Sequence, residues 1–76
     1  MYAKVTIDVN ASLGVHQHIG DGESYYILQG RALYDDNGIK RELQPGDVTF
    51  TPDQGFHGIE NIGDEPLVFM ALIIKV

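Results

Sequence analysis

Short runs of alternating apolar and polar residues, separated by turn residues, make up most of this chain. In the first run every second side chain is apolar, as in a β-strand that buries one face. No segment repeats convincingly with the period of an α-helix. The runs that predict strands are Ala3–Asp8, Val15–Ile19, Glu23–Gln29, Arg31–Asp35, Ile39–Leu43, Asp47–Thr51, His57–Asn61 and Pro66–Val76. About eight short, evenly spaced strands are typical of an all-β sandwich or barrel.

The last predicted strand departs from the alternation, because Leu67–Ile74 is apolar on both faces. A strand has this composition when both of its faces are covered. In so small a chain the second cover is most simply another subunit, so we predict a homodimer. The alternative is that a loop of the same chain covers this face.

The three histidines are the candidate chemistry of the chain. His16 and His18 form an H-x-H pair on one face of a predicted strand, since side chains two residues apart point the same way. Glu23 follows at the start of the next strand, and His57 lies in a later one. If this later strand lies beside the first, the imidazoles and the carboxylate converge, and together they form a ligand set for a divalent transition metal.

Each of these signals is weak by itself. A strand histidine often lies on a solvated face, and Glu23 could equally be a surface acid. The donor types also leave the identity of the ion open, because imidazole nitrogens and a carboxylate oxygen suit Mn, Fe, Co, Ni, Cu or Zn. Four protein ligands would leave two positions free on a six-coordinate ion, and these could hold water, dioxygen or a bidentate substrate.

The spacing of these residues resembles the two motifs of the cupin superfamily, over nearly the whole chain. His16-Gln17-His18, Glu23 and Gly30 match the first motif from its H-x-H onward, and Gly46, Pro52, His57 and Asn61 match the second. The resemblance implies a double-stranded β-helix, which is a small jelly-roll barrel with one metal ion bound inside. It implies that His16, His18, Glu23 and His57 are the metal ligands, and it agrees with a dimer.

Two positions depart from the cupin motifs. Asn10 stands where the first motif opens with glycine, and asparagine tolerates the left-handed backbone region. Gly55 comes one residue later than the glycine of the P-x-G sequence that begins at Pro52. This shift affects the expected shape of the loop over the site, but it leaves the ligand positions unchanged.

By the same alternation, apolar and aromatic side chains are predicted to face the ion. The strand residues expected to face it are Tyr25, Ile27, Val48, Phe50 and Ile59. Tyr25, Phe50 and Ile59, with Phe56 from a loop, would form the substrate pocket. Such a pocket suits a small-molecule ligand. The alternative for the strand residues among them is plain barrel core. No dedicated acid–base pair is evident, so the metal would carry most of any catalysis.

The length and net charge of the chain limit its domain organisation and its possible partners. The chain has 76 residues, 11 acidic and 5 basic side chains, a net charge of −6 and no cysteine. It is predicted to form a single domain, residues 1–76, so small that a metal ion or a second subunit is expected to add stability. The negative charge argues against nucleic acid and anionic membranes as partners. No signal peptide or membrane-spanning run is visible, which predicts a cytoplasmic protein.

Two functions fit these expectations. The first is a mononuclear metalloenzyme for a small oxygenated molecule that chelates the metal, similar to cupin dioxygenases or oxalate decarboxylases. The second is a non-catalytic small-molecule-binding or sensor domain in which the metal is structural. A structural β-domain with incidental histidines is a further alternative, and the fold alone selects none of them.

Overall fold

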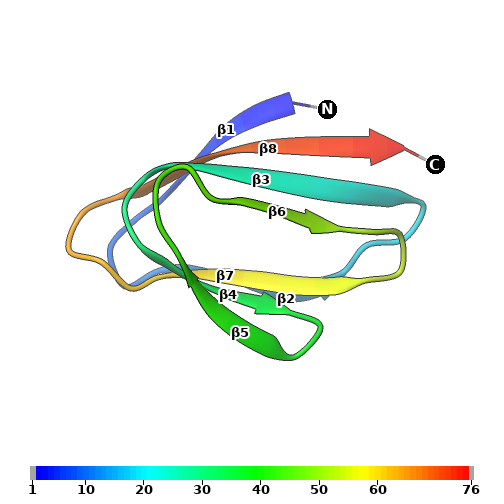
Figure 1. The fold of residues 1–76 in the computed structure, drawn as a ribbon, viewed down its shortest axis with the longest axis horizontal. Coiled ribbons are helices and arrows are strands. Elements are labelled where there is room, and N and C mark those ends of the chain that lie inside the picture. The colour runs from blue at the N-terminus through cyan, green and yellow to red at the C-terminus, as the bar shows by residue number, and fades with distance from the viewer. Residues whose placement is uncertain (1, 76) are drawn as a thin grey trace.

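The chain folds into two antiparallel sheets that face each other, as the computed structural model of residues 2–75 shows (Figure 1). The strands are β1 (Tyr2–Ile7), β2 (Ser12–Gln17), β3 (Asp21–Gln29), β4 (Ala32–Asp36), β5 (Ile39–Leu43), β6 (Val48–Thr51), β7 (Phe56–Asn61) and β8 (Leu67–Lys75). The first sheet has the strand order β1-β8-β3-β6, and the second has the order β2-β7-β4-β5. Residues 2–75 contain no helix long and apolar enough to cross a membrane.

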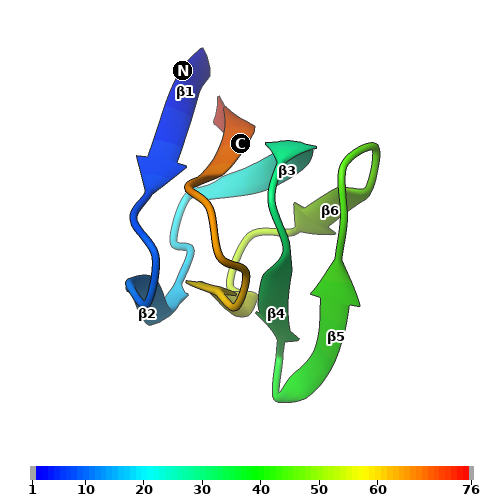
Figure 2. The ribbon, with the colours of Figure 1, turned by 90° about the vertical axis from the view of Figure 1, so that its left-hand side faces the viewer.

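Every connection crosses from one sheet to the other, except for the β4–β5 hairpin. Figure 2 shows the chain descending from β1 to β2 and rising again from β5 to β6. This winding is the double-stranded β-helix, so the predicted all-β jelly-roll barrel of eight strands is confirmed. The largest difference in strand bounds is at β2, which begins at Ser12 and ends before His18. Val76, predicted as the end of the last strand, lies outside the described residues.

The turns follow the predicted backbone chemistry. Asn37 and Gly38 have φ values of 49° and 91°, as the tight β4–β5 hairpin requires. Asn10, which replaces the motif glycine, has φ 66° and so retains the left-handed turn between β1 and β2. The hairpin and the first crossing between the sheets therefore each contain a residue that tolerates positive φ.

The core fills the space between the sheets with inward-facing side chains from both of them. Its buried hydrophobic residues are Ile7, Tyr25, Ile27, Ala32, Tyr34, Leu43, Ile59, Leu67, Phe69 and Ala71. In β8 the inward residues are buried, whereas Leu72 and Ile74 on the outer face are 38% and 48% exposed. The outer face of the first sheet is thus apolar and open to solvent.

The faces of β6 are opposite to the prediction. Thr49 and Thr51 are buried, while Val48 and Phe50 are 58% and 56% exposed, so the expectation that Val48 and Phe50 face the interior was wrong. The reason lies in the register with β3, in which Thr51 is paired with the inward-facing Glu23. Pairing fixes which residues of an edge strand face inward, whatever their hydrophobicity.

Gly58 in β7 allows β2 to approach closely. A Cβ at this position would lie 3.0 Å from both the backbone nitrogen and Cγ2 of Val15, and 3.1 Å from its Cα. The contact is adjacent to the register pair of His16 and His57. The small residue therefore helps to fix the distance between the strands that carry these histidines.

We predict that Gly58→Ala lowers the free energy of unfolding by about 1–3 kcal/mol, because the backbone of Val15 cannot rotate away from the added methyl group. Gly63→Ala is the matched control, since its Cβ would meet no atom closer than 3.5 Å. That control should stay within about 0.5 kcal/mol of the parent in urea unfolding. Equal destabilisation by the two substitutions would contradict the role of Gly58.

Candidate metal centre

His16 and His57 lie on neighbouring strands and are directly opposite each other in the register of β2 and β7. A register shift between Leu13 and His16 re-aims the end of β2, as β-bulges do next to functional sites. The carbonyl oxygen of Gly14 accepts a hydrogen bond from Nδ1 of His16 at 2.9 Å. The His57 side chain is fully buried, whereas His16 is exposed, so the cluster opens to solvent on the His16 side.

His18 lies just after β2 and is held by the loop that joins β6 to β7. Its backbone nitrogen donates to the carbonyl of Gly55 at 3.0 Å, and its carbonyl accepts from the backbone nitrogen of Gln54 at 2.6 Å. Gln54 occupies the position of the glycine in the P-x-G sequence of the second cupin motif. Its φ of 70° shows that the loop keeps a left-handed residue there. The carboxylate of Asp21 accepts from Nδ1 of His18 at 2.8 Å, which orients the ring.

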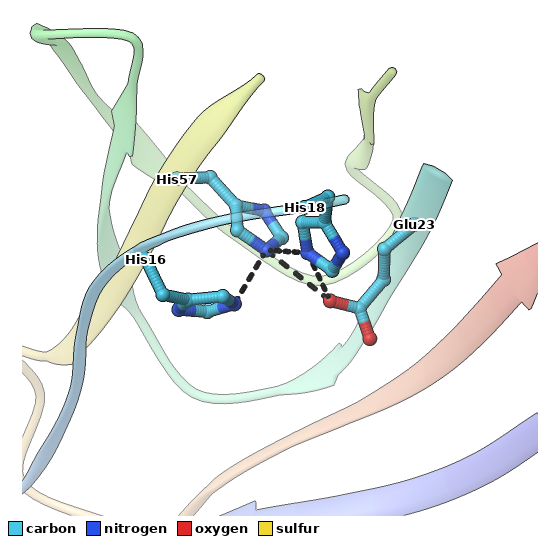
Figure 3. A group of neighbouring side chains, drawn as sticks. All are labelled: His16, His18, Glu23 and His57. Carbon is cyan, nitrogen blue, oxygen red and sulfur yellow. Dashed lines mark hydrogen bonds and ion pairs between the residues drawn. The ribbon is translucent and has the colours of Figure 1, made fainter. Parts of the chain in front are cut away.

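The four predicted ligand residues come together at one point. Their ligand atoms all lie within 4.8 Å of one another, and Figure 3 shows the side chains pointing toward a common centre. Nε2 of His57 is 2.8 Å from Nε2 of His18 and 3.2 Å from Nε2 of His16. Oε1 of Glu23 is 3.1 Å from Nε2 of His18 and 3.2 Å from Nε2 of His57.

The hydrogen-bond partners on the far side of each ring decide what faces this centre. A carbonyl and a carboxylate can only accept, so Nδ1 of His16 and of His18 carries the proton in the neutral ring. Their Nε2 atoms therefore present lone pairs toward the carboxylate of Glu23. Lone pairs that converge in a buried space need a cation or a proton between them, and this donor set fits a divalent transition metal.

The carboxyl group of Glu23 is ionised in this environment. Its burial by itself raises the pKa, but the hydrogen bond from His57 and the positive charge that His57 and His18 carry when protonated outweigh that effect and hold the pKa of Glu23 below its ordinary value. A metal ligand must be deprotonated to bind. Glu23 therefore supplies an anionic oxygen at neutral pH.

Tyr25 brings its phenol to the edge of the cluster. Its ring stacks on that of His57 with centroids 4.9 Å apart, and its hydroxyl lies 3.4 Å from Nε2 of His57. Burial and the neighbouring Glu23 carboxylate raise the pKa of Tyr25, so the phenol keeps its proton. It is thus a hydrogen-bond donor placed beside the convergence point.

The other predicted pocket residues are placed differently. Ile59 is buried two residues along β7 from His57 and belongs to the hydrophobic core. Phe50, as described above, is on the outer face of the first sheet. Phe56 is the first residue of β7 rather than part of a loop, is 44% exposed, and points away from His57 by strand alternation. Of the four predicted pocket residues, Tyr25 is thus the one whose hydroxyl reaches the cluster.

Sequence reasoning missed Asp21, Tyr34 and Thr51, which contact the rings from outside the cluster. Asp21 could have been found from its spacing, three residues after His18 beside a turn. Tyr34 and Thr51 contact Nδ1 of His57 from other strands, and nothing local in the sequence links them to it. A surface hollow of about 260 Å³ lies near the other end of β3, lined by Gly30, Arg31, Pro45, Gly63, Asp64 and Glu65, and includes none of the cluster.

Comparison with known proteins agrees with this geometry. A family model described as a cupin domain matches residues 3–73. The chain belongs to the cupin family. Among its relatives, the oxalate-binding protein of Thermotoga maritima is 40% identical over 74 residues, which are 97% of this chain and 61% of that protein. Oxalate decarboxylase OxdC of Bacillus subtilis is 37% identical over 92% of this chain and 20% of its own length.

A crystal structure described as a predicted oxalate decarboxylase from Thermotoga maritima superposes with a TM-score of 0.97 at 39% identity, covering 100% of this chain and 66% of that one. This cupin therefore spans less than two thirds of the length of these relatives. The shared part includes every strand of the barrel and the four clustered residues.

We predict that a divalent ion such as Mn²⁺ raises the melting temperature of the chelator-treated protein, because binding to the folded state adds about 2.7 kcal/mol at a hundredfold excess over Kd. Glu23→Gln should largely abolish this shift, since the amide is neutral. Glu60→Gln, on the exposed side of β7, is the matched control and should keep the shift. Calorimetry with and without ion tests this, and an equal ion-induced shift in both variants would exclude Glu23 as a ligand.

Proposed function

We propose that this cupin binds one divalent transition metal ion through His16, His18, Glu23 and His57, and that the ion holds a small molecule with oxygen donors. The convergence of their lone pairs in a largely buried space is the observation that carries the proposal. The donor set accepts Mn, Fe, Ni, Co, Cu or Zn and does not choose among them. When bound, the ion would supply Lewis-acid chemistry to the oxygen atoms of the ligand.

Oxalate, or a similarly small chelating carboxylate, is the ligand class that the relatives suggest. The proteins named for oxalate binding and oxalate decarboxylation share this part of the chain at 40% and 37% identity. A divalent cation beside the single carboxylate of Glu23 keeps a net positive charge, which attracts an anion. No lysine or arginine hydrogen-bonds to the four clustered side chains within residues 2–75, so the ion would be the anchor for that anion.

Tyr25 is the residue of the protein best placed to assist the ligand. Its protonated hydroxyl lies beside Nε2 of His57, so it can donate a hydrogen bond to an oxygen atom held at the ion. The same phenol is the observation that favours a catalytic role, as a proton donor in a metalloenzyme of the oxalate-decarboxylase or dioxygenase type. Binding of the ligand is the first requirement of either function.

We predict that oxalate binds the Mn²⁺-loaded protein in calorimetric titration and that acetate binds far more weakly, because acetate offers one carboxylate where oxalate chelates through two. Tyr25→Phe should weaken oxalate binding by about tenfold and leave Mn²⁺ binding unchanged, since it removes one hydrogen bond to an anion. Tyr2→Phe is the control, because Tyr2 lies on β1, outside the cluster, and is 67% exposed. Oxalate binding that is absent, or independent of Mn²⁺, would refute the proposed ligand class.

We also propose that the domain forms a homodimer through the outer face of the first sheet. This face carries exposed apolar side chains on three neighbouring strands, namely Tyr26, Val48, Phe50, Leu72 and Ile74. Contiguous apolar patches of this kind are typical of protein interfaces. A second copy presents the same patch, so the contact is self-complementary.

Leu72→Asp is predicted to give a monomer at concentrations where the parent sediments as a dimer, because it places a charge in the proposed interface. Ile39→Asp, at an exposed position of β5 in the other sheet, is the matched control and should stay dimeric. Sedimentation velocity at micromolar concentration distinguishes the two. A monomeric parent chain would contradict the dimer, with no consequence for the metal site.

A further inference from the structure

The three histidines of the cluster differ in what holds their Nδ1 atoms. His16 and His18 each donate to a group that can only accept, as described above. His57 instead meets two hydroxyl groups, with Nδ1 2.8 Å from the Tyr34 hydroxyl and 2.9 Å from Oγ1 of Thr51. These hydroxyls are themselves 2.8 Å apart, and all three side chains are fully buried.

A hydroxyl group can both donate and accept a hydrogen bond. The Tyr34–Thr51 pair therefore satisfies Nδ1 of His57 whether this atom carries a proton or a lone pair. On the other side of the ring, Nε2 of His57 lies 3.2 Å from Oε1 of Glu23 and 2.8 Å from Nε2 of His18, which both present lone pairs. A proton on Nε2 of His57 is thus also well bonded, and both neutral forms of this ring fit the site.

The choice between the two neutral forms matters for His57 because its Nε2 lies 2.8–3.2 Å from the ligand atoms of His18, His16 and Glu23 (Figure 3). In metal-free protein a proton on this atom would separate the lone pairs that otherwise face one another. In metal-bound protein the same atom must offer its own lone pair. Only an amphoteric partner on Nδ1 meets both requirements without leaving a buried polar atom unpaired.

We propose that Tyr34 and Thr51 are positioning residues that allow His57 to carry its proton on Nε2 in the metal-free protein and on Nδ1 in the metal-bound protein. One proton leaves Nε2, one arrives at Nδ1, and the ring stays neutral throughout. The Nε2 proton would leave to water that enters past the exposed His16. The Tyr34–Thr51 hydroxyl pair would pass a proton to Nδ1 and regain one from solvent when the barrel opens locally. The inference rests on the proposed metal site.

Nitrogen-15 NMR of histidine-labelled protein tests this directly, because the ring nitrogen shifts distinguish the two neutral forms. In chelator-treated protein His57 should carry its proton on Nε2, while His16 and His18 carry theirs on Nδ1. Diamagnetic Zn²⁺ should move the His57 proton to Nδ1 and leave the other two rings unchanged. A His57 ring protonated on Nδ1 both before and after Zn²⁺ would overturn the inference.

Substitutions test the hydroxyl pair itself. Thr51→Val should weaken Zn²⁺ binding by about 10–100-fold, as removal of partners to metal-binding histidines does, and should change the proportion of the two His57 forms. Thr51→Ser should restore both. Thr49→Val is the matched control, since Thr49 is the other buried threonine of β6 and its hydroxyl has no hydrogen-bond partner among the described residues. Equal effects of Thr49→Val and Thr51→Val on the His57 spectrum would refute a specific role.

The proposed metal site and the proposed proton shift of His57 are tested separately. If the parent protein binds no Zn²⁺ or other divalent ion, the proposed metal site falls, and this inference with it. If the parent binds Zn²⁺ and the His57 proton does not move, only the inference about Tyr34 and Thr51 is overturned. The spectra of the parent decide this point even if Thr51→Val fails to fold.

Discussion

Several electron-pair donors are forced together in the interior of this small barrel, and the rest of the structure is arranged around them. The Nε2 atoms of three imidazoles and an ionised carboxylate oxygen lie within 4.8 Å of one another, with His16 exposed and the other three residues buried. Such an arrangement is unfavourable unless a positive charge or a shared proton lies between the donors.

The fold meets this constraint by drawing on both sheets. β2 and β7 supply His16 and His57 from one layer, and β3 supplies Glu23 from the other. His18 follows β2 directly, and the β6–β7 loop holds it through its backbone. Every ring is also held from behind by a carbonyl, a carboxylate or a pair of hydroxyls. These hydrogen bonds on the outer nitrogen orient each ring, so that its other nitrogen is directed inward.

The two sheets differ in the surfaces that they present outside the cluster. The first sheet keeps an apolar outer face, which fits association with a second copy, whereas its inner face carries Tyr25 beside the histidines. The site itself opens where β2 is exposed, and it is bordered by a phenol donor rather than by fixed cationic side chains. An anionic ligand would therefore owe its binding to the ion, and its orientation to a hydrogen bond from the protein.

The sequence by itself determined the strand content, the hairpin at Asn37-Gly38 and the four residues of the cluster, because these depend on short-range alternation and on fixed spacing within motifs. Only the tertiary structure decided which face of β6 points inward, and it placed Thr49 and Thr51 where hydrophobicity favoured Val48 and Phe50. It also brought Tyr34 and Thr51 to the back of His57. The physical reason is that strand pairing and sheet stacking join residues distant along the chain, and no local pattern of apolar and polar residues encodes the register between them.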